Sequence, residues 1–470
     1  MTLTVVTRPR HTPVDQTQDS KALGYTDNRK IVRDRQGNLY IAYRKKYKIG
    51  ANTDYHIFVA QSTNNGSTWT VLNHDQSVET VGNFNQRVPS IAIDAKDNLH
   101  LVWYGADAQN PGENQHQIKY VRSTDGGVTW SAWRNIVAVE GYQGQTLWQE
   151  HPTLQVGPDD QLYVVWEGRD QDYPETIQIK FAKSGDGGST WSAWRNVAPA
   201  TRDRSRPTLV ATPGNQLYLL AYSSIKGVRQ IIFTHSQDQG DTWAPWTHVA
   251  RIEQDQRHVS VAVDGSGQVH AVWRQPPETI GVEDAGEGRK EPTAKPQVVY
   301  SSFSGAQWSQ PVPIGANPAA AQFFPSITVD NVDRVWVVWS ETGSEAEFPN
   351  EEPSDGAVYY ALKTGQRWSS RLLLRQHNRD IYPSLRQSGF AEHKAVDIVW
   401  LDNSEDDRRI YHATLRGPTG VTWLNERAQI VTTSIAGLLA SDSATSTFTE
   451  AQKGLRTILV RLVLLILIML

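Results

Sequence analysis

The chain has 470 residues, of which 39% are hydrophobic and 20% charged, and its formal net charge is −4. This length supports a large core organised as a barrel or a repeat array. The near-neutral charge argues against a basic nucleic-acid-binding face, so we expect no nucleic-acid partner. The absence of cysteine excludes disulfides, thiolate nucleophiles and cysteine-based zinc sites.

The first residues, MTLTVVTRPRHTP, contain no apolar segment after a basic start, so no secretory signal is predicted. We interpret Thr2–Val6 (TLTVV) as an outer strand that completes the last repeat unit and closes the fold.

An eight-residue box, Ser-x-Asp-x-Gly-x-Thr-Trp, recurs along the chain. The boxes and their degenerate copies end at Trp69, Trp130, Trp191, Trp243, Trp308, Trp368 and Trp423. This spacing predicts seven units of about 50–65 residues. In each box the Asp suits hydrogen bonds from turn amides, the Gly permits positive φ, and the Trp anchors the turn. We therefore interpret the box as scaffold.

Each unit also contains an alternating apolar run, a Gly/Asp/Asn turn and a second run ending in an aromatic residue. Examples are PSIAIDAKDNLHLVW from Pro89 and PTLQVGPDDQLYVVW from Pro152. This pattern predicts a hairpin, followed by a third strand before the box and a fourth after it. Seven such units predict an all-β, seven-bladed β-propeller of four-stranded antiparallel blades, with a β-solenoid as the alternative. The tryptophans that end second strands are predicted to pack between blades: Trp103, Trp166, Trp273, Trp339 and Trp400.

The boxes STDGGVTW, SGDGGSTW and SQDQGDTW resemble the Asp-box (BNR) repeats of sialidases and related propellers. The resemblance covers nearly all of residues 25–425 and implies a sialidase-like propeller. That superfamily contains enzymes and non-enzymes. Sialidases resemble six-bladed propellers, whereas this chain has seven units.

Arginines recur just before the predicted first strands, which begin near the propeller axis on the face opposite the boxes. Ligand sites on propellers form where such elements converge. The guanidinium fork suits carboxylate or phosphate, so the predicted partner at this face is an acidic sugar or other anionic ligand, or a protein. Five candidate ligand-binding residues follow from this position: Arg29, Arg87, Arg206, Arg257 and Arg379. The resemblance to sialidases adds Arg44, which matches a second arginine that follows the second strand of their first unit.

The resemblance also implies a catalytic set for a retaining exo-glycosidase of sialidase type. In it Tyr382 is the nucleophile, Glu150 takes its proton and Asp54 is the acid/base. The sialidase Arg-Ile-Pro signature is absent, since Lys30 and Ile31 follow Arg29. No pattern indicates a metal, a cofactor or a Ser-His-Asp triad.

The predicted domains are a propeller over residues 1–428, a Ser/Thr/Ala-rich linker over 429–454 and an apolar helical tail over 455–470. The tail is expected to contact a membrane, from the cytoplasmic side, or a hydrophobic partner. Two functions follow. The first is a non-catalytic binding or scaffold module tethered by the tail, and the alternative is the sialidase-type glycosidase.

Overall fold

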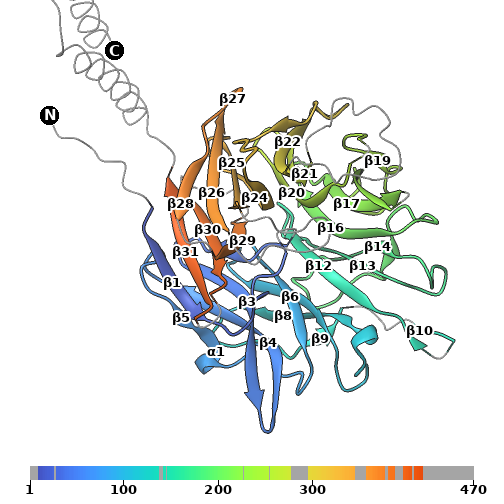
Figure 1. Cartoon of the computed structure of the whole chain (residues 1–470). Coiled ribbons are helices and arrows are strands. Elements are labelled where there is room, and N and C mark those ends of the chain that lie inside the picture. Colours follow the sequence, from blue (N-terminus) through green and yellow to red (C-terminus); the bar gives the residue numbers. More distant parts are fainter. Residues whose placement is uncertain are drawn as a thin grey trace, which may run out of the picture. The chain divides into compact units, whose positions relative to one another are not determined.

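The computed structural model contains the predicted hairpins as seven antiparallel sheets around an axis (Figure 1). Their second strands are buried on both faces, because each blade packs between two others. The structure describes residues 9–25, 28–136, 141–143, 145–225, 227–252, 254–276, 295–343, 356–375, 379–386, 395–404 and 407–416. The all-β seven-bladed propeller is confirmed. Helix in the described ranges is limited to the short turns α1 (Leu72–Asp75) and η1 (Glu113–Gln115).

The first four blades each consist of four strands that follow one another in sequence from the axis outward. Blade 1 contains β2 (Ile31–Arg33), β3 (Leu39–Ile49), β4 (Asn52–Ser62) and β5 (Thr70–Val71). Blade 2 contains β6 (Gln86–Ile93), β7 (Leu99–Gly105), β8 (Gln117–Ser123) and β9 (Arg134–Asn135). Blade 3 contains β12 (Gln149–Val156), β13 (Leu162–Gly168), β14 (Gln178–Ser184) and β15 (Arg195–Asn196), preceded by the small hairpin β10 (Gly141–Tyr142) and β11 (Gln145–Thr146). Blade 4 contains β16 (Arg204–Ala211), β17 (Leu217–Ile225), β18 (Val228–Ser236) and β19 (Thr247–His248).

The last three blades repeat this order with small variations. Blade 5 contains β20 (Arg257–Val263), β21 (Val269–Gln275), β22 (Gln297–Phe303) and β23 (Val312–Pro313). Blade 6 contains β24 (Ala321–Val329), β25 (Val335–Thr342) and β26 (Ala357–Thr364), with both β27 (Arg367–Trp368) and β28 (Leu372–Arg375) paired to β26. Blade 7 contains β29 (Asp380–Leu385), β30 (Ala395–Asp402) and β31 (Arg409–Arg416), with β1 (His11–Gln16) as its outer strand.

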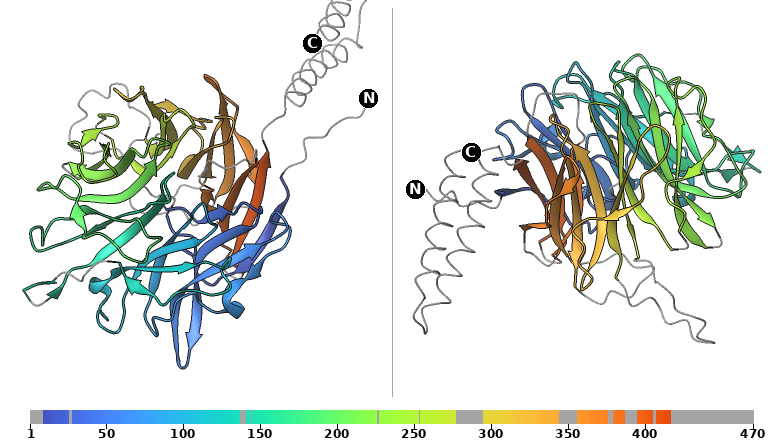
Figure 2. Two further views of the ribbon diagram at one scale, coloured as in Figure 1. Left: turned by 180° about the vertical axis from the view of Figure 1, so that it is seen from behind. Right: turned by 90° about the horizontal axis from the view of Figure 1, so that it is seen from above.

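The two ends of the propeller meet in blade 7. Strand β1 pairs antiparallel with β31, so an N-terminal strand completes the last blade (Figure 2). The sequence predicted such a closing strand at Thr2–Val6, which lies outside the described residues. In the structure β1 occupies this position.

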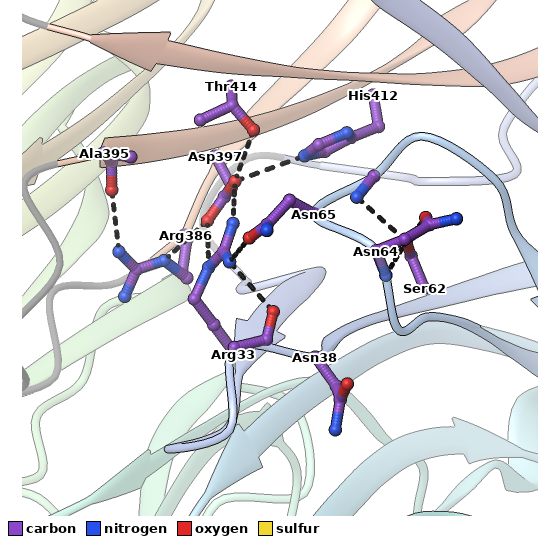
Figure 3. A network of polar contacts seen from close by, with 12 residues as sticks. Arg33, Asn38, Ser62, Asn64, Asn65, Arg386, Ala395, Asp397, His412 and Thr414 are labelled. Carbon is purple, nitrogen blue, oxygen red and sulfur yellow. Dashed lines mark hydrogen bonds and ion pairs between the residues drawn. The ribbon is translucent and has the colours of Figure 1, made fainter.

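A buried polar network joins blade 1 to blade 7 (Figure 3). The Asp397 carboxylate on β30 accepts hydrogen bonds from Arg33 Nε (2.9 Å) and Nη2 (2.7 Å) at the end of β2. It also accepts from Arg386 Nε (3.1 Å) and Thr414 Oγ1 (2.9 Å), and it lies 3.3 Å from His412 Nε2. This carboxylate therefore links the first and last blades where the ring closes.

The boxes form the turns between third and fourth strands, as predicted. Asp186 Oδ1 accepts from Thr190 N and Ser184 Oγ, both at 2.8 Å. Gly188 has φ +78°, and a Cβ there would lie 1.9 Å from the Tyr120 hydroxyl of the preceding blade. The Trp191 ring packs edge-on against Tyr120 at 5.3 Å between centroids. The box therefore packs one blade against the preceding blade. Its last copy, which ends at Trp423, lies outside the described residues.

The tryptophans that end second strands are fully buried, which confirms their predicted packing role. Strand β31, the last described element, ends at Arg416. The predicted linker (429–454) and tail (455–470) lie outside the described residues. Among the residues that are described, no helix has the length and apolar character needed to span a membrane.

Candidate functional site

Six of the seven first strands carry a bulge close to the axis. At each bulge a residue other than glycine has a positive φ of 49–57°: Val88, His151, Arg206, His258, Phe324 and Tyr382. All but His258 precede a proline. A non-glycine residue in this conformation costs about 1–3 kcal/mol, and such strain concentrates at functional sites. The bulges place these six residues at equivalent positions around the axis.

Glu150 and Glu167 face each other in the bulge of blade 3. They are register partners on β12 and β13, and like charges directly opposite destabilise an antiparallel pair. His151 Nε2 lies 3.6 Å from Glu150 Oε2 and 3.8 Å from Glu167 Oε1. His116 Nδ1, just before β8, hydrogen-bonds Glu150 Oε1 at 2.7 Å. Two carboxylates and two imidazoles therefore form one connected group.

Tyr104 on β7 completes this group, which we call the Glu150 cluster: Tyr104, His116, Glu150, His151 and Glu167. The Tyr104 ring lies 5.3 Å from the His116 ring and 5.0 Å from the His151 ring. The Glu150 side chain is 24% exposed, so the cluster is accessible through this carboxylate.

Burial fixes the protonation states in the cluster. The pKa of His151 is lowered well below 6.5 by burial and then by the nearby positive charges of Arg206 and Lys30. The pKa of Tyr104 is raised well above 10 by burial and by the Glu150 charge. At neutral pH His151 is therefore an uncharged proton acceptor, and Tyr104 keeps its proton and is a donor.

Arginines predicted to bind an anion lie beside the cluster. The Arg206 backbone N–H donates to Glu167 Oε2 (2.5 Å), and its guanidinium lies 3.6 Å from the centroid of the Tyr25 ring. Arg87 on β6 is the register partner of Tyr104, and both Arg87 and Arg206 contribute to the lowered pKa of His151. The structure thus brings Arg87, Arg206 and the predicted Glu150 together.

Arg44 takes part in an ion pair near this site. It donates to Asp19 through Nε and through Nη2 (2.8 Å), and its guanidinium lies 4.4 Å from the Tyr55 ring centroid. Its positive charge also lowers the pKa of Tyr104, which opposes the larger, raising effect of burial.

Arg29 is buried in the centre of the propeller. Its Nη1 donates to the carbonyl of Ile327 (3.0 Å) on β24 and its Nη2 to that of Val261 (2.5 Å) on β20. Asn28 Nδ2 donates to the Pro152 carbonyl at 2.6 Å, and Lys30 Nζ donates to that of Pro89. This segment cross-links first strands through the axis, which gives Arg29 a structural role in addition to the ligand-binding role predicted for it.

The other predicted residues lie on or next to strands of blades 1, 5 and 7. Tyr382 is 3% exposed and packs against Phe324 with 4.5 Å between ring centroids. Asp54 is on β4, opposite Tyr47, in the extension of the β3–β4 hairpin. Arg257 pairs with Asp255 in blade 5. Arg379 precedes β29, and its carbonyl accepts from the backbone N–H of Asn403 at 2.7 Å.

Four residues of the cluster had no predicted role: Tyr104, His116, His151 and Glu167. One signal was available for two of them. Tyr104 and Glu167 each follow the tryptophan that ends a second strand, and Arg274 has the same position in blade 5. A polar residue directly after a buried tryptophan at a strand end points to the opposite side of the sheet.

The donor atoms of Glu150, His151 and Glu167 lie within 4.8 Å of one another, a spacing compatible with metal ligation. However, Arg206, Lys30 and Arg87 place positive charge next to His151. This charge disfavours a cation and favours an anionic ligand beside the cluster.

Residues 75–390 match the family of BNR repeat-like domains, and this span is more than half of the chain. The chain belongs to this family. This BNR repeat-like propeller is therefore of the sialidase-like Asp-box type that its boxes indicated.

Solved structures are similar to this BNR repeat-like propeller at low sequence identity. An ulvan lyase, described as a polysaccharide lyase, has a TM-score of 0.54 and 11% identity over 88% of this chain and 98% of that chain. The polysaccharide lyase Uly1 has a TM-score of 0.51 and 10% identity over 84% and 90%. A Hadza microbial sialidase has a TM-score of 0.47 and 16% identity over 77% and 73%. No curated protein matched the sequence.

Proposed function

We propose that this protein cleaves an acidic polysaccharide by β-elimination beside a uronate carboxylate. The observation that carries the proposal is the Glu150 cluster, in which uncharged His151 and protonated Tyr104 lie beside Arg87 and Arg206. This combination supplies a base, an acid and a carboxylate-binding group at one place. The similarity in fold to polysaccharide lyases guides the choice of substrates to test.

Each group has a defined part in the reaction. Arg87 and Arg206 hold the uronate carboxylate, which makes the adjacent C–H bond more acidic. His151 accepts that proton, and Tyr104 donates its own to the departing glycosidic oxygen. A C–H and a C–O bond break, a C=C bond forms, and proton exchange with solvent restores both side chains. Glu150 and Glu167 stabilise the imidazolium that forms.

The test is the ultraviolet absorbance of the unsaturated product when the protein is incubated with a panel of uronate-containing polysaccharides. His151→Ala and Tyr104→Phe should each lower the turnover rate by about 10²–10⁴-fold, the usual contribution of a general base or acid. Tyr120→Phe is the matched control, because its hydroxyl lies 2.8 Å from His100 Nδ1 on the box face. If both variants formed the ultraviolet-absorbing product at the wild-type rate, the roles assigned to His151 and Tyr104 would be refuted.

A retaining glycoside hydrolase is a second candidate, because oxygen atoms of Glu150 and Glu167 lie within 4.8 Å. The two catalytic carboxyl groups of retaining enzymes are about 5–5.5 Å apart. This reaction would release reducing ends without ultraviolet absorbance, and Glu167→Gln should abolish it. A sialoside belongs in the same panel, because turnover lost in Tyr382→Phe would support the sialidase-type set. Glycan binding without any product would support the binding-module hypothesis instead.

A further inference from the structure

Trp148 and Arg169 face each other at the open end of the hairpin that carries Glu150 and Glu167. The backbone N–H of Arg169 donates to the Trp148 carbonyl at 3.2 Å, so the two residues continue the pairing of β12 with β13. The Arg169 guanidinium lies 5.8 Å from the centroid of the Trp148 ring, close enough for a cation–π attraction. Both residues are partly exposed. These two residues, which we call the Trp148 pair, therefore form one contact that solvent and ligands can reach.

The Trp148 pair lies on the same face of the sheet as the two glutamates of the Glu150 cluster. Side chains alternate between the two faces of a strand, so residues two apart share a face. Trp148 is two residues before Glu150, and Arg169 is two residues after Glu167. At about 3.3 Å per residue the two pairs are roughly 7 Å apart, a separation comparable with the length of one sugar unit. A glycan bound at the cluster can therefore place a neighbouring unit at the Trp148 pair.

Other blades have different residues at this position, although they share the bulge and its register. None of the five equivalent pairs contains an aromatic ring: Asn85 and Ala106, Asp203 and Ser224, Asp255 and Pro276, Ala321 and Thr342, and Arg379 and Asn403. Residues that the scaffold needs, such as the box tryptophans, recur in successive blades. The Trp148 pair is therefore a local feature of blade 3, the blade that also supplies Glu150, His151 and Glu167.

Both members of the pair suit a sugar with a negative substituent. The flat apolar face of an indole ring packs against the C–H face of a sugar ring. A guanidinium binds a carboxylate or sulfate through paired N–H donors. The buried Nε of Arg169 has no hydrogen-bond partner among the described residues, and an unsatisfied buried donor costs free energy unless a ligand or water binds it. Arg169 therefore retains a donor for an oxyanion.

We propose that Trp148 and Arg169 form a subsite for the sugar unit next to the one at the Glu150 cluster. The ring of this sugar stacks on Trp148, and a carboxylate or sulfate on it binds Arg169. The inference rests on the acidic-glycan function proposed above and narrows its substrate to glycans whose neighbouring unit also carries an oxyanion.

The experiment measures binding of two tetrasaccharides to the full chain by titration calorimetry. One is a glucuronate tetramer, and in the other glucuronate alternates with a sulfated sugar. All proteins carry His151→Ala, which slows cleavage during the titration. Adding Trp148→Ala should weaken binding of both tetramers about tenfold or more, as expected for truncating a tryptophan that contacts a ligand. Trp148→Tyr keeps an aromatic ring and should restore most of this loss.

Arg169→Gln tests the second half of the subsite and identifies the ligand group. It should weaken binding about tenfold or more, because a hydrogen bond between charged groups is lost. A loss for the sulfated tetramer alone assigns Arg169 to sulfate, and a loss for the glucuronate tetramer assigns it to carboxylate.

The matched controls are Trp246→Ala and Arg134→Gln. Trp246 lies 5.2 Å from the Arg204 guanidinium and Arg134 lies 5.6 Å from the Tyr120 ring, and both residues are partly exposed. They lie beside or on the outermost strands of blades 4 and 2, so neither change should affect binding. If Trp148→Ala does not fold, Arg169→Gln and Trp148→Tyr still decide the result. Unchanged affinity in Trp148→Ala or Arg169→Gln, an equal loss in the controls, or no binding by the parent protein would overturn the proposal.

Cleavage is measured separately with His151 intact, so the two proposals can fail independently. Binding that depends on Trp148 and Arg169 without any cleaved product keeps the subsite and removes the lyase function. Product formation whose KM is the same in wild type, Trp148→Ala and Arg169→Gln keeps the lyase function and removes the subsite.

Discussion

Replacing Asp397 by asparagine should strongly destabilise the propeller at the junction of blades 1 and 7. The Asp397 side chain is fully buried and accepts two hydrogen bonds from Arg33 and one from Arg386. Asparagine removes the charge that compensates both guanidinium groups and turns an amide donor toward them. Removing one partner of a buried ion pair typically costs about 3–5 kcal/mol, and we expect a loss in this range.

The dependence on pH provides a second readout of the same network. Burial alone would raise the pKa of Asp397, but hydrogen bonds from His412 and Arg33 and the charge of Arg386 hold it far below 3.8. The stabilisation is therefore present above about pH 4 and is lost as the pH falls toward the folded-state pKa. Asp397→Asn should consequently show a shallower loss of stability in acid than the wild type.

Urea unfolding between pH 3 and 7 measures both effects. Asp407→Asn is the control, because Asp407 is 49% exposed and pairs with Arg409 at 2.7 Å in the same blade. Exposed pairs contribute about 0–1 kcal/mol, so this variant should resemble the wild type. An Asp397→Asn protein as stable as the Asp407→Asn protein would refute the reasoning.

Four further outcomes are expected. Arg29→Met leaves two buried carbonyls without their donor and should lower the free energy of unfolding by about 2–6 kcal/mol in urea; a loss below about 1 kcal/mol would contradict the axial cross-link. Burial raises the pKa of Asp380 to about 8, against the opposing effect of Arg375, so stability from this group falls as the pH rises from 4 to 8. Melting curves should therefore show Asp380→Asn gaining stability relative to wild type over that interval, and a constant difference would exclude the shift. Because the pKa of His151 lies below 6.5, the acid limb of kcat/KM should lie below pH 6.5, and a limb above it would exclude His151 as the base. A chain beginning at residue 17 lacks β1 and should melt lower and aggregate through the exposed edge of β31, whereas a chain beginning at residue 9 should not; an equal loss in both would assign closure to Thr2–Val6.

The sequence was sufficient to predict the blades because its signals are local. A box such as Ser184–Trp191 contains its own turn chemistry, and each hairpin consists of two short apolar runs separated by a turn signal. The predicted closure of blade 7 by an N-terminal strand also follows from the topology. Its position could not be predicted, because β1 contains little of the apolar alternation that made Thr2–Val6 stand out.

The candidate site was predicted less completely because it depends on backbone geometry and on distant contacts. A bulge at His151 changes which side chains face the axis, and a left-handed histidine before proline has no clear sequence signature. The sequence predicted an equivalent role for all arginines at first-strand starts. In the structure Arg29 binds carbonyls in the centre of the propeller, whereas Arg206 lies at the Glu150 cluster. Only the packing of the whole ring distinguishes these two environments.

The position of Arg29 has a consequence for synthesis of the protein. One carbonyl that it binds, that of Ile327, lies 298 residues further along the chain. At about 5–20 residues per second, a ribosome needs roughly 15–60 s to make this intervening segment. During that interval Asn28 and Lys30 can already bind the carbonyls of blades 3 and 2, whereas Arg29 cannot yet bind that of blade 6. The central cross-link of the protein is therefore completed only after blade 6 has been synthesised, although one of the first segments to leave the ribosome supplies it.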